Sequence, residues 1–139
     1  MAKKYFNDQD PIELKNSFIY QDDSVLTPPT LTADVDDYNP AGFQEGGDGD
    51  VLVSILRVSS NGGTDDIRGL KAPNPAKRVV VIFQNVGTSG TVQLTNNAGT
   101  SQPANRFMNN ANVNIAPNEG AAVVYDTTDL RWRQLSDYK

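Results

Sequence analysis

Lys77-Arg78-Val79-Val80-Val81-Ile82-Phe83-Gln84 is the stretch that decides the fold class. Its centre, residues 79–83, is an unbroken run of β-branched and aromatic side chains and predicts the strongest strand of the chain. A turn follows at Asn85–Gly90, and Thr91–Thr95 then alternates polar and apolar side chains. We expect residues 91–95 to form a hairpin with residues 77–84.

Short apolar stretches between turn residues continue on both sides of this strand. Val51–Val58 predicts a largely buried strand closed by the turn residues Ser59–Gly63. No segment repeats apolar residues at helical spacing over three turns. The fold is therefore expected to be all-β, an antiparallel β-sandwich or jelly roll over residues 51–139. Its expected strands are residues 51–58, 67–70, 77–84, 91–95, 113–115, 121–125 and 130–135, the last two forming a terminal hairpin.

Residues 1–50 have a different composition and are expected to form an extended N-terminal arm. Apolar residues are sparse there, and prolines at 11, 28, 29 and 40 interrupt regular structure. Residues 34–50 are mostly Asp, Gly, Asn, Pro and Gln, with Tyr38 and Phe43 as isolated anchors. This composition predicts disorder in isolation. We therefore expect the arm to take its shape from a neighbouring subunit.

One stretch of the arm has the pattern of a strand. Ile12, Leu14, Phe18 and Tyr20 occupy even positions, with Asn16 as the exception, so one face of an extended segment would be apolar. Such a strand could be an edge strand of the protein's own sheet, or it could add to the sheet of a partner. We slightly favour the second interpretation, which makes these four residues the candidate partner-binding residues.

The composition argues against an enzyme. The chain has no Cys and no His, so thiolate nucleophiles, thiolate zinc sites and the commonest general base are all missing. Most of the acidic residues lie in the arm, which is a poor scaffold for a precisely spaced pair of carboxylates. Calcium binding by Gly46–Asp50, or by Asp34, Asp36 and Asp37, is a weaker interpretation than a hinge and turns. No catalytic residue, metal or cofactor is expected.

Charge and hydropathy limit the classes of partner that the chain is expected to bind. Residues 1–50 hold three Lys against eleven Asp or Glu, a net charge of −8, and the remaining residues carry +3 of the total −5. Nucleic acid is not an expected partner, because binding to phosphates needs a basic surface. The longest apolar run, Val79–Phe83, is too short to cross a membrane, and the N-terminus lacks the apolar core of a signal peptide. We therefore expect the protein to be made in a cytosol.

The C-terminal Arg131-Trp132-Arg133 holds the only Trp of the chain. On a strand, Trp132 faces one way and both arginines face the other. Either Trp132 caps the core and the arginines are solvated, which we favour, or the group forms a subunit contact.

An ordered set of motifs resembles a known module. The set is Asn85–Leu94, Ser101–Phe107, a Pro-Asn turn, Val124-Tyr125-Asp126 and Arg131-Trp132-Arg133. It resembles the small β-sandwich of tailed-bacteriophage virion proteins, which include capsid decoration proteins, head fibres and some tail-fibre domains. The resemblance covers about residues 51–135 and implies a virion protein that is commonly trimeric. It also implies that Asn105, Arg106 and Phe107 fix the long loop and that Tyr125, Asp126, Arg131, Trp132 and Arg133 form a closing hairpin.

These observations lead to an expected function. The chain is expected to be a capsid decoration protein, of a cement or head-fibre anchoring type, located in the virion and assembled in the host cytoplasm. Its arm would bind the major capsid protein or another virion protein, and its sandwich would form a homo-oligomer, a trimer. The alternative is a tail-fibre or baseplate module that binds a host-surface glycan. A carbohydrate-active enzyme is a third possibility, and for it we expect no turnover.

Overall fold

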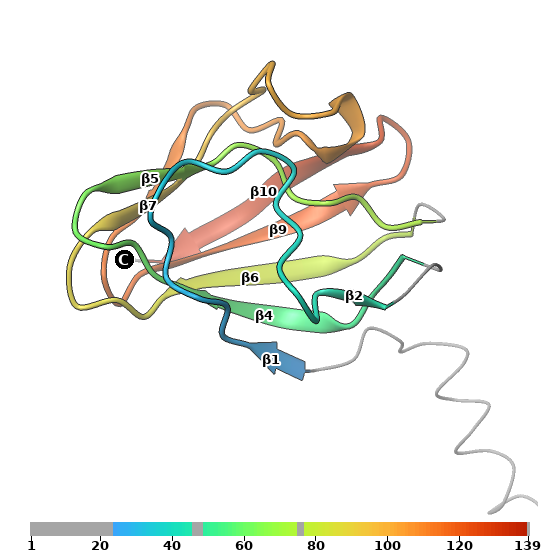
Figure 1. Cartoon of the computed structure of the whole chain (residues 1–139). Helices are drawn as coiled ribbons and strands as arrows, with labels where there is room; N and C mark the ends of the chain where they lie inside the picture. Colours follow the sequence, from blue (N-terminus) through green and yellow to red (C-terminus); the bar gives the residue numbers. More distant parts are fainter. Residues whose placement is uncertain (1–23, 46–48, 75–76, 139) are drawn as a thin grey trace, which may run out of the picture.

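The computed structural model describes residues 24–45, 49–74 and 77–138, and they form two packed β-sheets (Figure 1). The all-β sandwich predicted from the strand pattern is confirmed. Its only helical element among the described residues is a 3₁₀ turn, η1 (Pro103–Asn105). No helix in this part of the chain is long and apolar enough to cross a membrane.

The first sheet has five strands in the order β1-β4-β6-β9-β10. β1 and β4 run parallel, as do β4 and β6, whereas β9 is antiparallel to both β6 and β10. The last pair is the predicted terminal hairpin. The bounds are β1 (Ser24–Leu26), β4 (Val53–Val58), β6 (Val80–Asn85), β9 (Gly120–Asp126) and β10 (Arg131–Tyr138).

The second sheet has three strands in the order β5-β7-β8, with β5 and β7 parallel and β7 and β8 antiparallel. The bounds are β5 (Thr64–Ile67), β7 (Thr91–Leu94) and β8 (Val113–Ile115). A separate small pair joins β2 (Gln44–Glu45) to β3 (Asp50–Val51). The sandwich is therefore mixed rather than purely antiparallel.

The predicted hairpin between residues 77–84 and 91–95 is wrong, because β6 and β7 belong to different sheets. Both sides of β6 are already occupied, by β4 and by β9. The turn carries the chain across to the second sheet instead, and Asn85 holds it by donating from Nδ2 to the carbonyls of Gly90 (3.0 Å) and Ile115 (2.8 Å). Gly90 has a positive φ of 84°, and a Cβ there would lie 2.7 Å from Ser60 Oγ, so this position requires glycine.

Part of the predicted arm is part of the body, and the expectation that residues 1–50 need a neighbour is wrong for residues 24–45. Residues 31–38 run parallel to β5 and its continuation, with bridges from Leu31 to Ser60, Val35 to Ile67 and Tyr38 to Leu70. The segment crosses in front of the five-stranded sheet in Figure 1.

The physical reason is that this segment places single apolar side chains into the core. Leu31, Tyr38 and Phe43 are all buried, and Phe43 is completely inaccessible. Burial raises the pKa of the Tyr38 phenol to about 12. A low average hydrophobicity therefore coexists with enough well-spaced anchors to order the backbone on the protein's own second sheet.

The core lies between the two sheets, and the prediction for Trp132 is confirmed. Its side chain is fully buried, and its ring meets that of Tyr125 edge-on at a centroid distance of 5.1 Å. The indole Nε1 donates to the Leu70 carbonyl at 2.7 Å. Arg131 and Arg133, on the opposite face of β10, are only partly buried.

Candidate functional site

The candidate partner-binding residues Ile12, Leu14, Phe18 and Tyr20 lie outside the described residues. The described chain begins at Ser24 in β1, which is the edge strand of the five-stranded sheet. Val25 in this strand is 53% exposed. Residues 1–23 are therefore attached to the body at a sheet edge.

The long loop between β7 and β8 is held by Arg106. Its Nε donates to the Ser101 carbonyl at 2.9 Å, and its Nη2 donates to the Gly99 carbonyl at 3.2 Å. The guanidinium has a fixed fork of donors and can therefore bind several backbone carbonyls of one loop at once. Arg106 thus fixes the conformation of the loop.

Asn105 connects this loop to the segment that packs against β5. It is buried, its Oδ1 accepts from the Ala72 N–H at 2.8 Å, and its Nδ2 donates to Asp37 Oδ1 at 2.8 Å. Its backbone carbonyl accepts from the Leu70 N–H at 2.8 Å. One buried amide therefore joins three segments that are far apart in the sequence.

Phe107 anchors the loop in the core and joins the edges of the two sheets. Its side chain is fully buried and contacts Phe83 edge-on, with ring centroids 6.2 Å apart. It forms single parallel bridges to Asn96 on one side and to Trp132 on the other. The β10 edge of the sandwich is therefore covered near Trp132.

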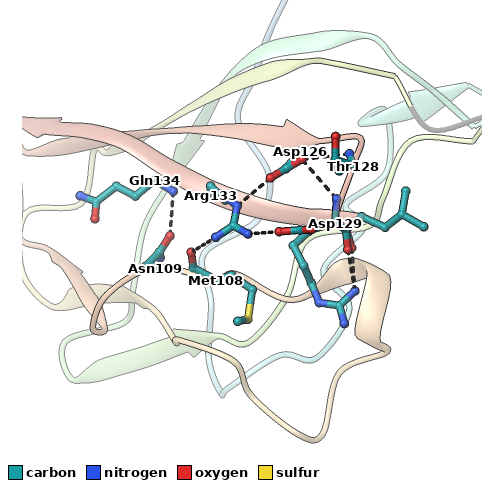
Figure 2. Close-up of polar contacts among 9 residues, drawn as sticks. Met108, Asn109, Asp126, Thr128, Asp129, Arg133 and Gln134 are labelled. Carbon is teal, nitrogen blue, oxygen red and sulfur yellow. Dashed lines mark hydrogen bonds and ion pairs between the residues drawn. The ribbon is translucent and has the colours of Figure 1, made fainter.

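Asp126, Asp129 and Arg133 form an ion-pair network at the turn of the closing hairpin (Figure 2). Arg133 Nε donates to Asp126 Oδ2 at 2.8 Å, and Arg133 also pairs with Asp129. Asp126 Oδ1 accepts from the backbone N–H of Thr128 at 2.9 Å. The guanidinium of Arg133 is therefore paired within its own hairpin, and Arg133 is not an unpaired positive charge available to a partner.

Two residues of this region were not predicted from the sequence. Asn109 Oδ1 accepts from the Gln134 N–H at 2.8 Å, and the Met108 N–H donates to the Trp132 carbonyl at 2.7 Å. Figure 2 shows both loop residues beside β10. The asparagine-rich loop sequence gives no signal that distinguishes Asn109 from its neighbours.

The network changes the ionisation of both partners. The hydrogen bond from Arg133 and the N–H groups of Thr128 and Asp129 lower the pKa of the Asp126 carboxyl below its usual 3.8. The hydrogen bonds to Asp126 and Asp129 raise the pKa of Arg133. Both shifts favour the charged forms, so Asp126 and Arg133 form an ion pair at neutral pH.

We expect this network to make stability depend on pH in the acid range. The pKa of Asp126 is lower in the folded state than in the unfolded state, so its stabilising effect is complete above about pH 3.8. It is lost as the pH falls through the lower, folded-state pKa. Thermal unfolding of the wild type and of Asp126→Asn between pH 2 and pH 6 should show a smaller acid dependence in the variant. Equal dependence in both proteins would contradict this.

The acidic residues at 34, 36 and 37, which were expected to belong to the arm, form hydrogen bonds and an ion pair with the body. Asp34 pairs with Arg68, Asp36 accepts from Thr100 Oγ1 at 2.7 Å, and Asp37 accepts from the Gln102 N–H at 2.7 Å. Residues 24–45, 49–74 and 77–138 hold no group of three or more acidic side chains placed to bind a metal ion. Each of these aspartates therefore ties residues 34–37 to a distant part of the body.

A polar groove of about 400 Å³ lies beside η1 and contains no aromatic side chain in its lining. Its polar groups are largely used internally, since Gln44 Nε2 donates to the Ala72 carbonyl at 2.8 Å. Six aromatic side chains have a described burial, and all six are buried: Tyr38, Phe43, Phe83, Phe107, Tyr125 and Trp132. None of these six side chains, Trp132 included, can therefore serve as a platform for a sugar ring.

Comparisons of the chain with protein-family models, with curated proteins and with solved structures each gave no match.

Proposed function

We propose that the chain is a structural protein of a tailed-bacteriophage virion, a capsid decoration protein. In this proposal residues 1–23 bind the major capsid protein or another virion protein, and the sandwich forms a trimer. The binding segment is shorter than the 50 residues expected from composition, because residues 24–45 belong to the body. The proposal is supported by the resemblance of the motifs in residues 51–135.

The observation that carries the proposal is how the body uses its polar residues. Arg106, Asn105 and Asp126 all bond to loops and turns of the same chain. A body whose loops are held in this way is a rigid platform. The stretch 12–20, with its alternating apolar residues, is then the segment of the chain that most needs a partner to bury its apolar side chains. That segment joins the body at the edge strand β1.

The energetics suit a decoration protein that oligomerises. Each apolar side chain of residues 12–20 that is fully buried on a partner contributes about 1.5–3 kcal/mol. Ordering each backbone residue costs about 1–2 kcal/mol, so a single segment binds weakly. Linking three segments through one trimer raises the apparent affinity by a factor of about 100 or more when the spacing of the sites fits.

The decisive experiment changes the apolar face of the binding segment in the full chain. We expect Leu14→Ser combined with Phe18→Ser to weaken binding to capsids of the encoding phage, stripped of this protein, by at least about tenfold per side chain. Co-sedimentation of purified chain with the stripped capsids measures this binding.

Glu13→Ser combined with Lys15→Ser is the matched control, since it changes two residues of the same stretch on its polar side. The control should bind like the wild type. Full occupancy of capsids by the Leu14 and Phe18 variant would refute the proposal.

A further inference from the structure

The outer face of the five-stranded sheet carries a row of apolar side chains. Register places Val25 beside Ile55, Ile55 beside Ile82, and Ile82 beside Ala122. Val124 lies on the same face of β9, two residues along. Val25 is exposed and the other four are half-buried. These five residues are called the outer apolar face below.

The outer apolar face does not pack on the core. The partly buried hydrophobic side chains that contact the core are Leu26, Val35, Leu52 and Ala72, and none of the five is among them. Their neighbours along the strands, such as Leu56, Phe83 and Val123, are the ones that are buried between the sheets. The outer side of the sheet therefore has an apolar centre, with polar residues such as Arg57, Gln84 and Arg133 in the rows around it.

Such a pattern predicts a cover on the second side. A sheet face in water normally carries polar residues, and the row Val25, Ile55, Ile82 and Ala122 across four adjacent strands departs from that pattern. A contiguous apolar patch on an otherwise polar surface marks an interaction site. We propose that copies of this chain pack on one another through the outer apolar face.

The dimensions favour a second copy over the chain's own N-terminal segment. Strands lie about 4.8 Å apart and rise about 3.3 Å per residue, so five strands of about six residues cover on the order of 480 Å². One extended segment would cover about a fifth of that width, and its backbone N–H and C=O groups would lack partners against a sheet face. A second sheet has the same width and already satisfies its own backbone.

The area is close to what a stable contact needs. Two copies meeting over the whole outer side of this sheet, apolar centre and polar rim together, would remove about 960 Å² in flat projection, near the lower limit of about 1,000 Å² for a specific interface. Side-chain relief adds to the accessible area. Sheets that pack face to face stand about 10 Å apart with interdigitating side chains, which suits branched residues such as Ile82 and Val124.

The charges also permit contact between identical faces. The central row from Val25 to Ala122 has no charged residue. Arg57 lies in the next row on one side, and Arg133 lies beside Val124 in the next row on the other side, where it is paired with Asp126. Identical faces can therefore approach without placing like charges opposite each other at the centre.

This inference rests on the proposed function, because that proposal needs a body that oligomerises, and it names the surface that does so. The first test is sedimentation velocity of the purified full chain without any capsid. We expect a concentration-dependent oligomer whose dissociation constant rises at least about 30-fold in Ile82→Glu, a central hot-spot substitution. Val86→Glu is the control, since Val86 is exposed at the turn after β6, outside the outer apolar face.

A monomeric wild type, or an oligomer that Ile82→Glu does not weaken, would overturn the inference. An oligomer that forms through this face but does not bind capsids would instead refute only the proposed function. A dimer would support the inference and correct the trimer of the proposed function, whereas a trimer would overturn the inference, because a face that packs on its own copy joins only two chains.

A second test does not depend on how well Ile82→Glu folds. The chain has no cysteine, so Ala122→Cys introduces a single thiol within the outer apolar face, next to Ile82. We expect this thiol to react with a water-soluble disulfide reagent at least about tenfold more slowly than that of the exposed control Thr128→Cys, and dilution should reduce the difference to the part that comes from the partial burial of Ala122 in the single chain. A difference that does not change with concentration would overturn the inference.

Discussion

Replacing Trp132 by Ala is expected to lower the free energy of unfolding by about 3–5 kcal/mol, the usual cost of deleting a fully buried aromatic side chain. Three contributions add up at this position. The indole is completely inaccessible, its ring packs edge-on against Tyr125, and its Nε1 donates to the Leu70 carbonyl. Because a domain of this size has a total stability of about 5–15 kcal/mol, the variant should be partly unfolded near 37 °C. Urea denaturation followed by far-UV circular dichroism measures the loss.

Two further variants separate the contributions. Trp132→Phe keeps most of the apolar volume but leaves the Leu70 carbonyl without its donor, which should cost about 1–3 kcal/mol. Arg131→Ala is the control, since Arg131 lies on the opposite face of β10 and is only partly buried. A Trp132→Ala protein as stable as the Arg131→Ala protein would show that the ring is not a core residue.

The second large effect is expected at Asn85. Its Nδ2 donates to the carbonyls of Gly90 and Ile115, and its Oδ1 accepts from the Gly87 N–H at 2.9 Å. Asn85→Ala removes all three bonds and leaves buried backbone groups unsatisfied. We expect a loss of about 2–4 kcal/mol in the free energy of unfolding, measured by urea denaturation.

Thr88→Ala is the matched control, because Thr88 is exposed in the same turn. The control should unfold at nearly the same urea concentration as the wild type. If Asn85→Ala also unfolds there, the amide does not hold the crossing between the sheets.

Most strands from β4 onward could be predicted because each carries its own signal, although β5 lies at Thr64–Ile67 and not at the expected residues 67–70. The alternation around Trp132 correctly placed the ring in the core and the flanking arginines outside. The sheet that each strand joins could not be predicted in the same way. The same turn residues could follow Asn85 whether the chain folds back within one sheet or crosses to the other. The chain crosses because both sides of β6 are already occupied by other strands.

The boundary between the arm and the body could not be predicted from composition, for a different reason. Composition averages over a segment, whereas packing depends on single anchors, and Leu31, Tyr38 and Phe43 are spaced so that each reaches the core. The loop residues Asn105, Arg106 and Phe107 were found through a resemblance. Their bonding partners, such as Ser101 and Asp37, could not be predicted because they lie far away in the sequence or share no pattern.

The parallel pairing of β1 with β4 has a consequence for synthesis. Ser24–Leu26 leaves the ribosome well before Val53–Leu56, and the segment around Tyr38 leaves before Leu70, so neither has its partner when it first emerges. The five-stranded sheet is completed only when β10, the last strand, has been made. Long-range pairing of this kind slows folding, so residues 24–38 of each nascent chain stay unpaired until their partners among residues 53–70 have been made.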